Sequence, residues 1–289
     1  MTPFFNKKNK LALYLIAIIA TIALLITYSH ANKANISSEK LTTEQKLKKC
    51  EEMYIEAKAN PRRFSYDKWK DHAKQCKYLT DNGNKKAQYL MGKLSQLAVN
   101  KNKNSLKMKS LAMVWFYISY QNGYQEAKQE FYNLLKSSRK EDIARAYIGI
   151  SNTYKQDPKI FNLKSPDYKS SWEMEKLAAK HGNIMGYIAL STGYGRGYHY
   201  SYKNIPKHFP ESYKWSFLAK NNYGTYHDGN GTDIENNQKI AQKVMDKLRS
   251  FMTEKQINET KISLRKWLKE NPEFVPDMNE ALRKVDDIK

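Results

Sequence analysis

The stretch Gly182–Gly197, which reads GNIMGYIALSTGYGRG, decides the fold that this sequence predicts. Gly186 comes four residues after the first glycine, and Leu190 and Ser191 come eight and nine residues after it. Residues four apart share one face of a helix, so this face carries small residues on which a neighbouring helix can pack closely. Tyr194 lies one turn further on and would fill the groove beside them. The pattern predicts a helix that turns back at glycines on both sides.

The same register occurs earlier in the chain, in the stretch GNKKAQYLMG. It begins at Gly83, continues with Ala87 and then places Met91 and Gly92 side by side. A third start follows at Gly123. The second helix of each pair would cover its hairpin with a tryptophan. We predict that these hairpins pack through Gly83, Ala87, Gly92, Ala112, Trp115, Gly123, Gly182, Gly186, Leu190, Tyr194, Gly197, Trp215 and Ala219.

The rest of the chain also has helical spacing, and no window shows sustained strand alternation. Only 12 Gly and 8 Pro occur in 289 residues, which suits helices joined by short loops. Capping boxes at Thr42–Gln45 and Thr253–Gln256 mark helix starts, and Ser165–Pro166 predicts a cap followed by a first-turn proline. We predict helices near 40–59, 65–80, 84–98, 106–121, 125–137, 140–155, 167–181, 183–195, 210–222, 234–251, 254–270 and 277–286.

These hairpins resemble the Sel-1-like repeat, a relative of the tetratricopeptide repeat. The resemblance implies an all-α fold, a right-handed α-solenoid of antiparallel helical hairpins, with protein binding as its use. The chain departs from the family pattern in two places. Met174 stands where the family has tryptophan, and the basic linker Lys136–Asp142 with an extra helix interrupts the array. We predict four segments: an anchor at 1–31, a helical pair at 32–82, repeats at 83–231 and capping helices at 232–289.

The N-terminus resembles an export signal. Lys7, Lys8 and Lys10 precede the apolar run Leu11–Tyr28, whose length lies between a signal-peptide core and a membrane-spanning helix. Lysines before the run favour a cytoplasmic N-terminus. We therefore predict a single-pass protein of the bacterial inner membrane with its bulk in the periplasm. The alternative is a soluble periplasmic protein cut near Ala31.

The chain has two cysteines, Cys50 and Cys76, and both fall in the first predicted helical pair. In an oxidising compartment, such a pair favours a disulfide over a reactive site. A bridge would limit the unfolded chain and stabilise the fold by about 2–4 kcal/mol. A pair of free buried thiols is the alternative.

The charge of the chain is strongly basic, with 50 Lys and Arg against 29 Asp and Glu. The lysines are scattered among asparagines, and the sequence contains no zinc finger or RNP signature, so we expect no nucleic-acid partner. The charge is either a compositional bias that gives solvated surfaces or an attraction to an acidic protein or anionic lipid.

The sequence contains no recognisable catalytic or metal motif. The six histidines do not pair with Glu or Cys at metal-ligand spacing, and no Gly-x-Ser-x-Gly elbow or phosphate loop occurs. Asp228–Asp233 resembles a calcium loop, but Lys239 stands where a bidentate glutamate is required. We expect no enzyme activity, cofactor, metal or small-molecule substrate, with a hydrolase as the lesser alternative.

The most unusual segment is the tyrosine-rich loop that ends the best repeat. Tyrosine and arginine are frequent interface anchors, so we predict partner binding through Arg196, Tyr198, Tyr200 and Tyr202, unless these tyrosines fold back over the hairpin. Exported Sel-1-like proteins include immunity proteins that neutralise phospholipase effectors of type VI secretion. The resemblance therefore implies an immunity protein that binds an acidic lipase-type toxin. The alternative is an envelope adaptor that binds a resident periplasmic or membrane partner.

Overall fold

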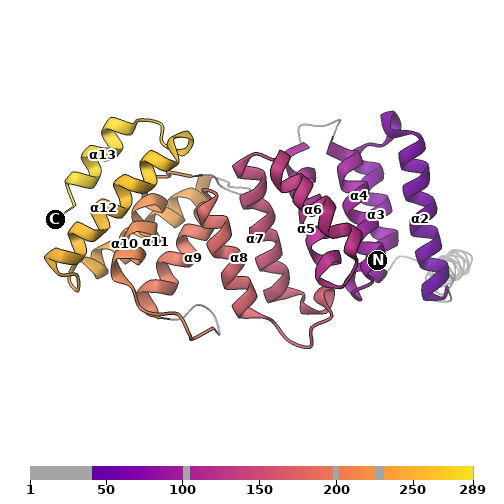
Figure 1. Cartoon of the computed structure of the whole chain (residues 1–289), viewed down its shortest axis with the longest axis horizontal. Helices are drawn as coiled ribbons and strands as arrows, with labels where there is room; N and C mark the ends of the chain where they lie inside the picture. The colour runs from indigo at the N-terminus through magenta and orange to yellow at the C-terminus, as the bar shows by residue number, and fades with distance from the viewer. Residues whose placement is uncertain (1–40, 100–104, 198–201, 225–230, 289) are drawn as a thin grey trace, which may run out of the picture. The chain divides into compact units, whose positions relative to one another are not determined.

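The computed structural model describes residues 41–99, 105–197, 202–224 and 231–288, which contain twelve α-helices and no β-strand. Every predicted helix is present, with boundaries within about three residues of those expected. The all-α prediction is therefore confirmed (Figure 1). The helices are α2 (Thr43–Ala59), α3 (Tyr66–Asp81), α4 (Lys85–Ala98), α5 (Ser105–Gln121), α6 (Gln125–Ser137), α7 (Lys140–Gln156), α8 (Tyr168–Lys180), α9 (Ile184–Arg196), α10 (Phe209–Lys220), α11 (Gly231–Arg249), α12 (Glu254–Glu270) and α13 (Met278–Asp286).

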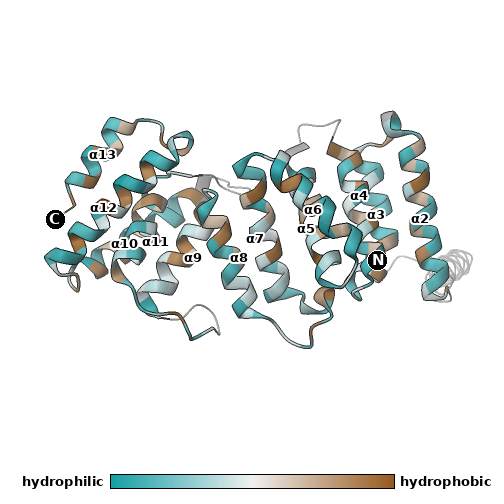
Figure 2. Cartoon of the chain, viewed as in Figure 1, coloured by the Kyte–Doolittle hydropathy of each residue, from teal (hydrophilic) through white to brown (hydrophobic). Residues whose placement is uncertain are grey.

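The chain divides into two compact units, Met1–Lys49 and Cys50–Lys289. In the first unit, the Thr42–Gln45 capping box is present, since each backbone N–H bonds to the side chain of the other residue. In the second unit, helices pack mainly on their neighbours in sequence, from α3 on α4 through to α12 on α13. Apolar residues concentrate on the faces where helices meet (Figure 2). One hydrophobic core joins α5 to α8, and another joins α8 to α13.

Close contacts between helices occur where side chains are small. A Cβ atom on Gly186 would lie 2.7 Å from the backbone nitrogen of Ala179 in α8. The turns before α4, α6 and α9 each contain a glycine with positive φ, at Gly83 (74°), Gly123 (89°) and Gly182 (87°). A side chain would strain the backbone at these turns.

The helix α7 continues the small–large–small register, although the sequence had indicated an interruption there. It places Ala144, Ile148 and Gly149 at the spacing found in α4 and α9, and a Cβ atom on Gly149 would lie 2.9 Å from a methyl group of Val114 in α5. The helix α7 packs against both α5 and α8, whereas α6 packs on α5. The additional helix in the array is therefore α6.

A proline turn ends three of the helices in the same way. Short 3-10 segments begin at Pro61, Pro158 and Pro272, each after an Asn or Asp with φ between −123° and −136°. A buried phenylalanine directly follows the first segment, at Phe64, and is the last residue of the other two, at Phe161 and Phe274. These prolines fall in the predicted breaks between helices, and the structure adds that a buried phenylalanine anchors each turn, with Phe161 and Phe274 belonging to the two hydrophobic cores.

The turns at Pro158 and Pro272 contact distant parts of the chain. After the turn at Pro158, the Asn162 side chain donates a hydrogen bond to the Gly83 carbonyl, 79 residues earlier. At the turn that begins with Pro272, Phe274 lies against Gly182, and the Glu273 carboxylate pairs with Lys140 at 2.6 Å. Both glycine turns are thus covered by a later segment of the same chain.

The predicted disulfide is confirmed. Cys50 in α2 and Cys76 in α3 are joined, with their Cα atoms 5.7 Å apart, and both residues are fully buried. The Thr253–Gln256 capping box is also present. The predicted cap at Ser165 is wrong, because α8 begins three residues later and the Asp167 side chain accepts a hydrogen bond from the Ser170 N–H.

The inner-membrane and periplasmic localisation is corrected. Within 41–99, 105–197, 202–224 and 231–288, no helix combines the length and the apolar character needed to cross a membrane. The apolar run Leu11–Tyr28, on which that prediction depended, lies outside the described residues, as does Ala31.

The close contact at Gly186 predicts that Gly186→Ala lowers the free energy of unfolding by about 1–3 kcal/mol, because the new methyl group meets rigid backbone. Gly149→Ala is the matched control, since there the obstacle is one side-chain methyl of Val114 and not backbone, and alanine favours the helix by about 1 kcal/mol. Urea denaturation followed by circular dichroism measures both. Equal losses for the two variants would contradict the explanation.

The disulfide predicts that the Cys50→Ala/Cys76→Ala variant is less stable than wild type by about 2–4 kcal/mol, because the bridge restricts the unfolded chain. Urea denaturation with and without a reductant measures this. Reductant should destabilise the wild type and leave the double variant unchanged. A wild-type midpoint that does not respond to complete reduction would overturn this prediction.

Candidate functional site

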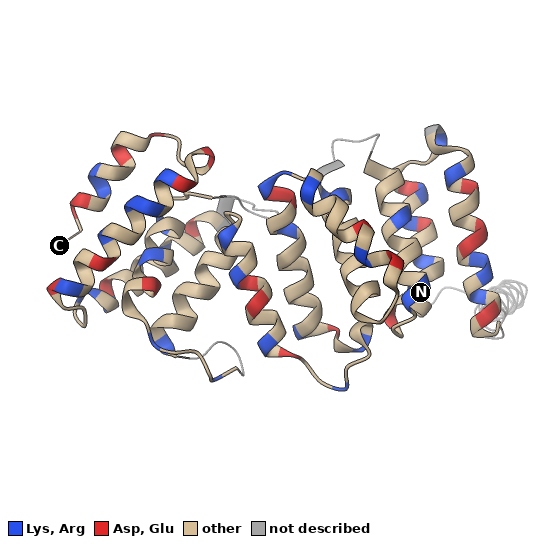
Figure 3. Ribbon diagram, in the orientation of Figure 1, with Lys and Arg blue, Asp and Glu red and all other residues tan. Residues whose placement is uncertain are grey.

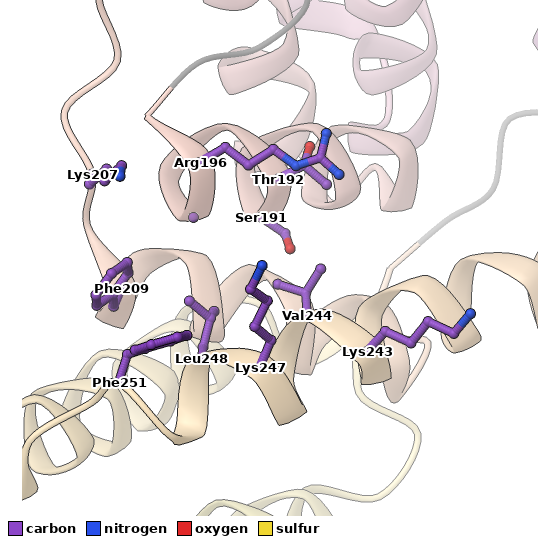
Figure 4. A pocket seen from close by; sticks show the side chains of 11 residues that line it. Ser191, Thr192, Arg196, Lys207, Phe209, Lys243, Val244, Lys247, Leu248 and Phe251 are labelled. Carbon is purple, nitrogen blue, oxygen red and sulfur yellow. The ribbon is translucent and has the colours of Figure 1, made fainter.

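The candidate site is a groove of about 550 Å³ between α9 and α11, which we call the α9–α11 groove (Figure 4). The segment that leads into α10 closes one end of it. Such a volume lies in the range of ligand-binding clefts. The groove is lined by Ser191, Thr192, Gly195, Arg196, Lys207, Phe209, Lys243, Val244, Lys247, Leu248 and Phe251.

The floor of the groove depends on close packing between α9 and α10. The Ser191 and Ser216 hydroxyl oxygens lie 2.6 Å apart, and the Ser212 hydroxyl donates to the Ser191 carbonyl oxygen at 2.6 Å. A Cβ atom on Gly195 would lie 2.8 Å from the Ser212 hydroxyl oxygen. These serines are fully buried, and their hydroxyl groups form hydrogen bonds within the set of three. The polar atoms beneath the groove therefore have hydrogen-bond partners.

The walls of the groove combine cationic and apolar side chains. Arg196 extends from the end of α9, and Lys243 and Lys247 extend from α11 (Figure 4). Leu248 is buried beneath them, whereas Phe251 just beyond α11 is 58% exposed. The Phe209 ring lies 6.3 Å from the Phe251 ring and closes the end of the groove.

The lining of the groove includes no acidic residue, and four of its side chains are basic. Arg196, Lys207, Lys243 and Lys247 form no ion pair with another residue in the part of the chain that the structure describes. Elsewhere, basic and acidic residues are interspersed along most helices (Figure 3), and many of them pair. The groove therefore presents positive charge that the described chain does not neutralise.

The predicted partner-binding residues are only partly placed. Arg196 lines the groove, while Tyr202 is half-buried and packs against the core that joins α8 to α13. Tyr198 and Tyr200 lie outside the described residues. Partner binding through these four residues stays a prediction.

The predicted packing residues lie partly in contacts between helices and partly in the turns that join them. Trp215 is buried and stacks on Tyr187 with ring centroids 5.3 Å apart. Tyr194 makes an edge contact with Trp172 at 5.6 Å, and burial, followed by Glu211 and Glu173, raises the pKa of its hydroxyl. Trp172 is therefore the tryptophan of α8 that packs on Tyr194.

The other predicted packing positions divide into buried residues and turns. Trp115 is half-buried and lines a second, smaller groove of about 390 Å³ with Tyr66 and Trp69. The small or apolar positions in the helix contacts are Ala87, Gly92, Ala112, Gly186, Leu190 and Ala219, and the positive-φ turns are Gly83, Gly123, Gly182 and Gly197.

A buried polar cluster lies between α7 and α8. The Glu175 carboxylate accepts hydrogen bonds from the Ser151 hydroxyl at 3.2 Å and from the Lys155 ammonium at 2.8 Å. The Lys155 and Glu175 side chains are only 12% and 4% exposed. Enclosure between two packed helices suits a structural role for this cluster. Among the described residues, no group of three or more His, Cys, Asp or Glu could hold a metal ion.

Sequence reasoning missed most of the groove. Lys243, Lys247 and Phe251 follow one another at four-residue intervals, beside the apolar pair Val244 and Leu248. That spacing was a readable signal of an amphipathic helix with a basic edge. No pattern in the sequence indicated that the segment before α10 closes one end of the groove.

No family model matches the chain, and no curated protein matches it. Among solved structures, a protective antigen of uropathogenic Escherichia coli strains, described as displaying an SLR fold, is similar over 75% of this chain with 14% identity and a TM-score of 0.33. The matched part of this chain spans 44% of that protein. The all-α fold is established from the helices of the chain itself.

Proposed function

We propose that this chain is a non-enzymatic, protein-binding scaffold whose α9–α11 groove binds an acidic surface of its partner. The observation that carries the proposal is the set of four cations, Arg196, Lys207, Lys243 and Lys247, gathered around an apolar lining that contains no carboxylate. Unpaired positive charge beside apolar surface favours a partner that supplies both acidic and apolar groups. Such complementarity speeds association and sharpens specificity.

The finer proposal is that the partner is a secreted toxin of lipase type, which this chain neutralises by occupying it. An inhibitory scaffold needs a rigid surface and no catalytic residues of its own. The polar cluster around Glu175 is enclosed, and the groove lining carries no histidine or carboxylate. Both features support binding over turnover.

Growth tests the finer proposal directly. Cells that express a lipase-type toxin from the same organism are grown with and without this chain. We expect this chain to restore growth by stoichiometric binding. If it protects against none of these toxins, neutralisation is wrong.

The basic groove predicts that Lys243→Glu/Lys247→Glu abolishes protection and weakens binding of the purified toxin at least tenfold, because reversed charges repel an acidic surface. The matched control is Lys164→Glu/Lys255→Glu, which reverses two exposed lysines that do not line the groove. Binding is measured by isothermal titration calorimetry at low and moderate salt, where screening should weaken the wild-type complex. If both double variants protect equally well, the groove is not the binding site.

A further inference from the structure

The α9–α11 groove lies between two parallel helices. Near the start of α9, the Asn237 side-chain amide, nearly two turns into α11, lies 3.4 Å from the Met185 sulfur. Towards their C-terminal ends, a Cβ atom on Gly195 would lie 3.9 Å from the Leu248 side chain. The two contacts are ten or eleven residues apart on each helix. At 1.5 Å per residue, the helices flank each other over about 16 Å, or about three turns.

Apolar side chains are exposed on both helices and beyond the end of α11. Met185 near the start of α9 and Ile240 in the middle of α11 are 43% and 42% exposed, about one turn or more outside the groove lining, and Phe251 of the lining is 58% exposed. Ile240 and Val244 lie four residues apart on one face of α11, and Phe251 follows just beyond the end of the helix. An apolar stripe that another helix of the chain would ordinarily cover is therefore left open in the described structure.

Basic side chains border the apolar stripe on both sides. Arg196 lies on the α9 side, and Lys243 and Lys247 lie on the α11 side (Figure 4). A ligand that matches this arrangement has a central row of apolar residues with acidic residues beside it. An amphipathic helix provides that pattern, because residues three and four apart form one stripe and the intervening positions flank it.

We propose that the α9–α11 groove binds an amphipathic helix of the partner protein, about three turns long, with Asp or Glu on both sides of its apolar stripe. This inference rests on the proposed protein-binding function and names the element of the partner that is recognised. In this kind of recognition, apolar side chains three, four and seven residues apart on the bound helix insert into the groove.

Two other occupants fit the groove less well. An extended strand gains its affinity by pairing with a sheet edge, and the walls here are helices whose backbone groups bond internally. A second copy of this chain brings a formal net charge of +21 towards a basic groove. Charge complementarity therefore selects an acidic partner helix.

Synthetic peptides test the proposal on the full-length protein. One 16-residue peptide carries leucines at helical three- and four-residue spacing with glutamates on both flanks. The second has the same composition in an order without helical periodicity. Fluorescence anisotropy measures their dissociation constants, and circular dichroism follows helix formation on binding. We expect the amphipathic peptide to bind at least tenfold more tightly and to become helical.

Groove variants show where the peptide binds. Ile240→Ser/Phe251→Ser removes two exposed anchors, so the protein should fold normally, which its thermal midpoint checks. We expect this variant to bind the amphipathic peptide at least tenfold more weakly. The matched control is Ile55→Ser/Ile262→Ser, which removes two isoleucines that are also exposed, at 63% and 66%, but lie on α2 and α12 and not on α9 or α11.

The possible failures are distinguishable. If the two peptides bind with equal affinity and Lys243→Glu/Lys247→Glu abolishes the binding of both, the inference of a helical ligand is wrong. The proposed binding of an acidic partner would still hold. If the protein binds phosphatidylglycerol vesicles and does not discriminate between the peptides, the inference of a helical ligand is also wrong. The groove would then be a site for a lipid surface. Binding of neither peptide overturns the inference, while the growth assay still tests neutralisation.

Discussion

The architecture depends on how closely helix backbones can approach where side chains are small. At Gly186 the contact is with backbone atoms of α8, so this position cannot accommodate even a methyl group without movement. On the other side of α9, Ser191 meets Ser216 and Ser212 of α10 through short hydrogen bonds. The helix α9 is thus held between α8 and α10 at fixed separations. Its remaining face, towards α11, is the face that carries the groove.

That arrangement explains why the groove is open. Serine is as small as the packing requires, and its hydroxyl finds a partner in the neighbouring helix, so the floor stays tight without leaving polar atoms unsatisfied. Bulky residues at Ser191 or Gly195 would displace α9 or fill the cleft. The cations stand at the rim, where their long apolar stems can cover Val244 and Leu248 while their charged ends remain in water.

Local signals in the sequence were sufficient to place the helices. Glycines with positive φ, prolines and caps such as Thr253–Gln256 end or begin helices through their own backbone chemistry, which needs no tertiary information. The sequence pattern begins with a glycine four residues before the first small residue of the helix. In α7 this position is Lys140, so the pattern there was missed. The groove could be read only in part. Arg196 and the basic edge of α11 were visible, but their approach to Phe209 depends on how separate helices pack.

The turns that follow the prolines have a consequence for how the array unfolds. In a simple helical repeat protein each unit contacts only its neighbours, so one end can fray while the rest stays folded. Here Asn162 holds the turn at Gly83, and Lys140 bonds to Asn271 across 131 residues. Opening either end therefore breaks contacts in the interior of the array, which couples distant hairpins into a more cooperative transition.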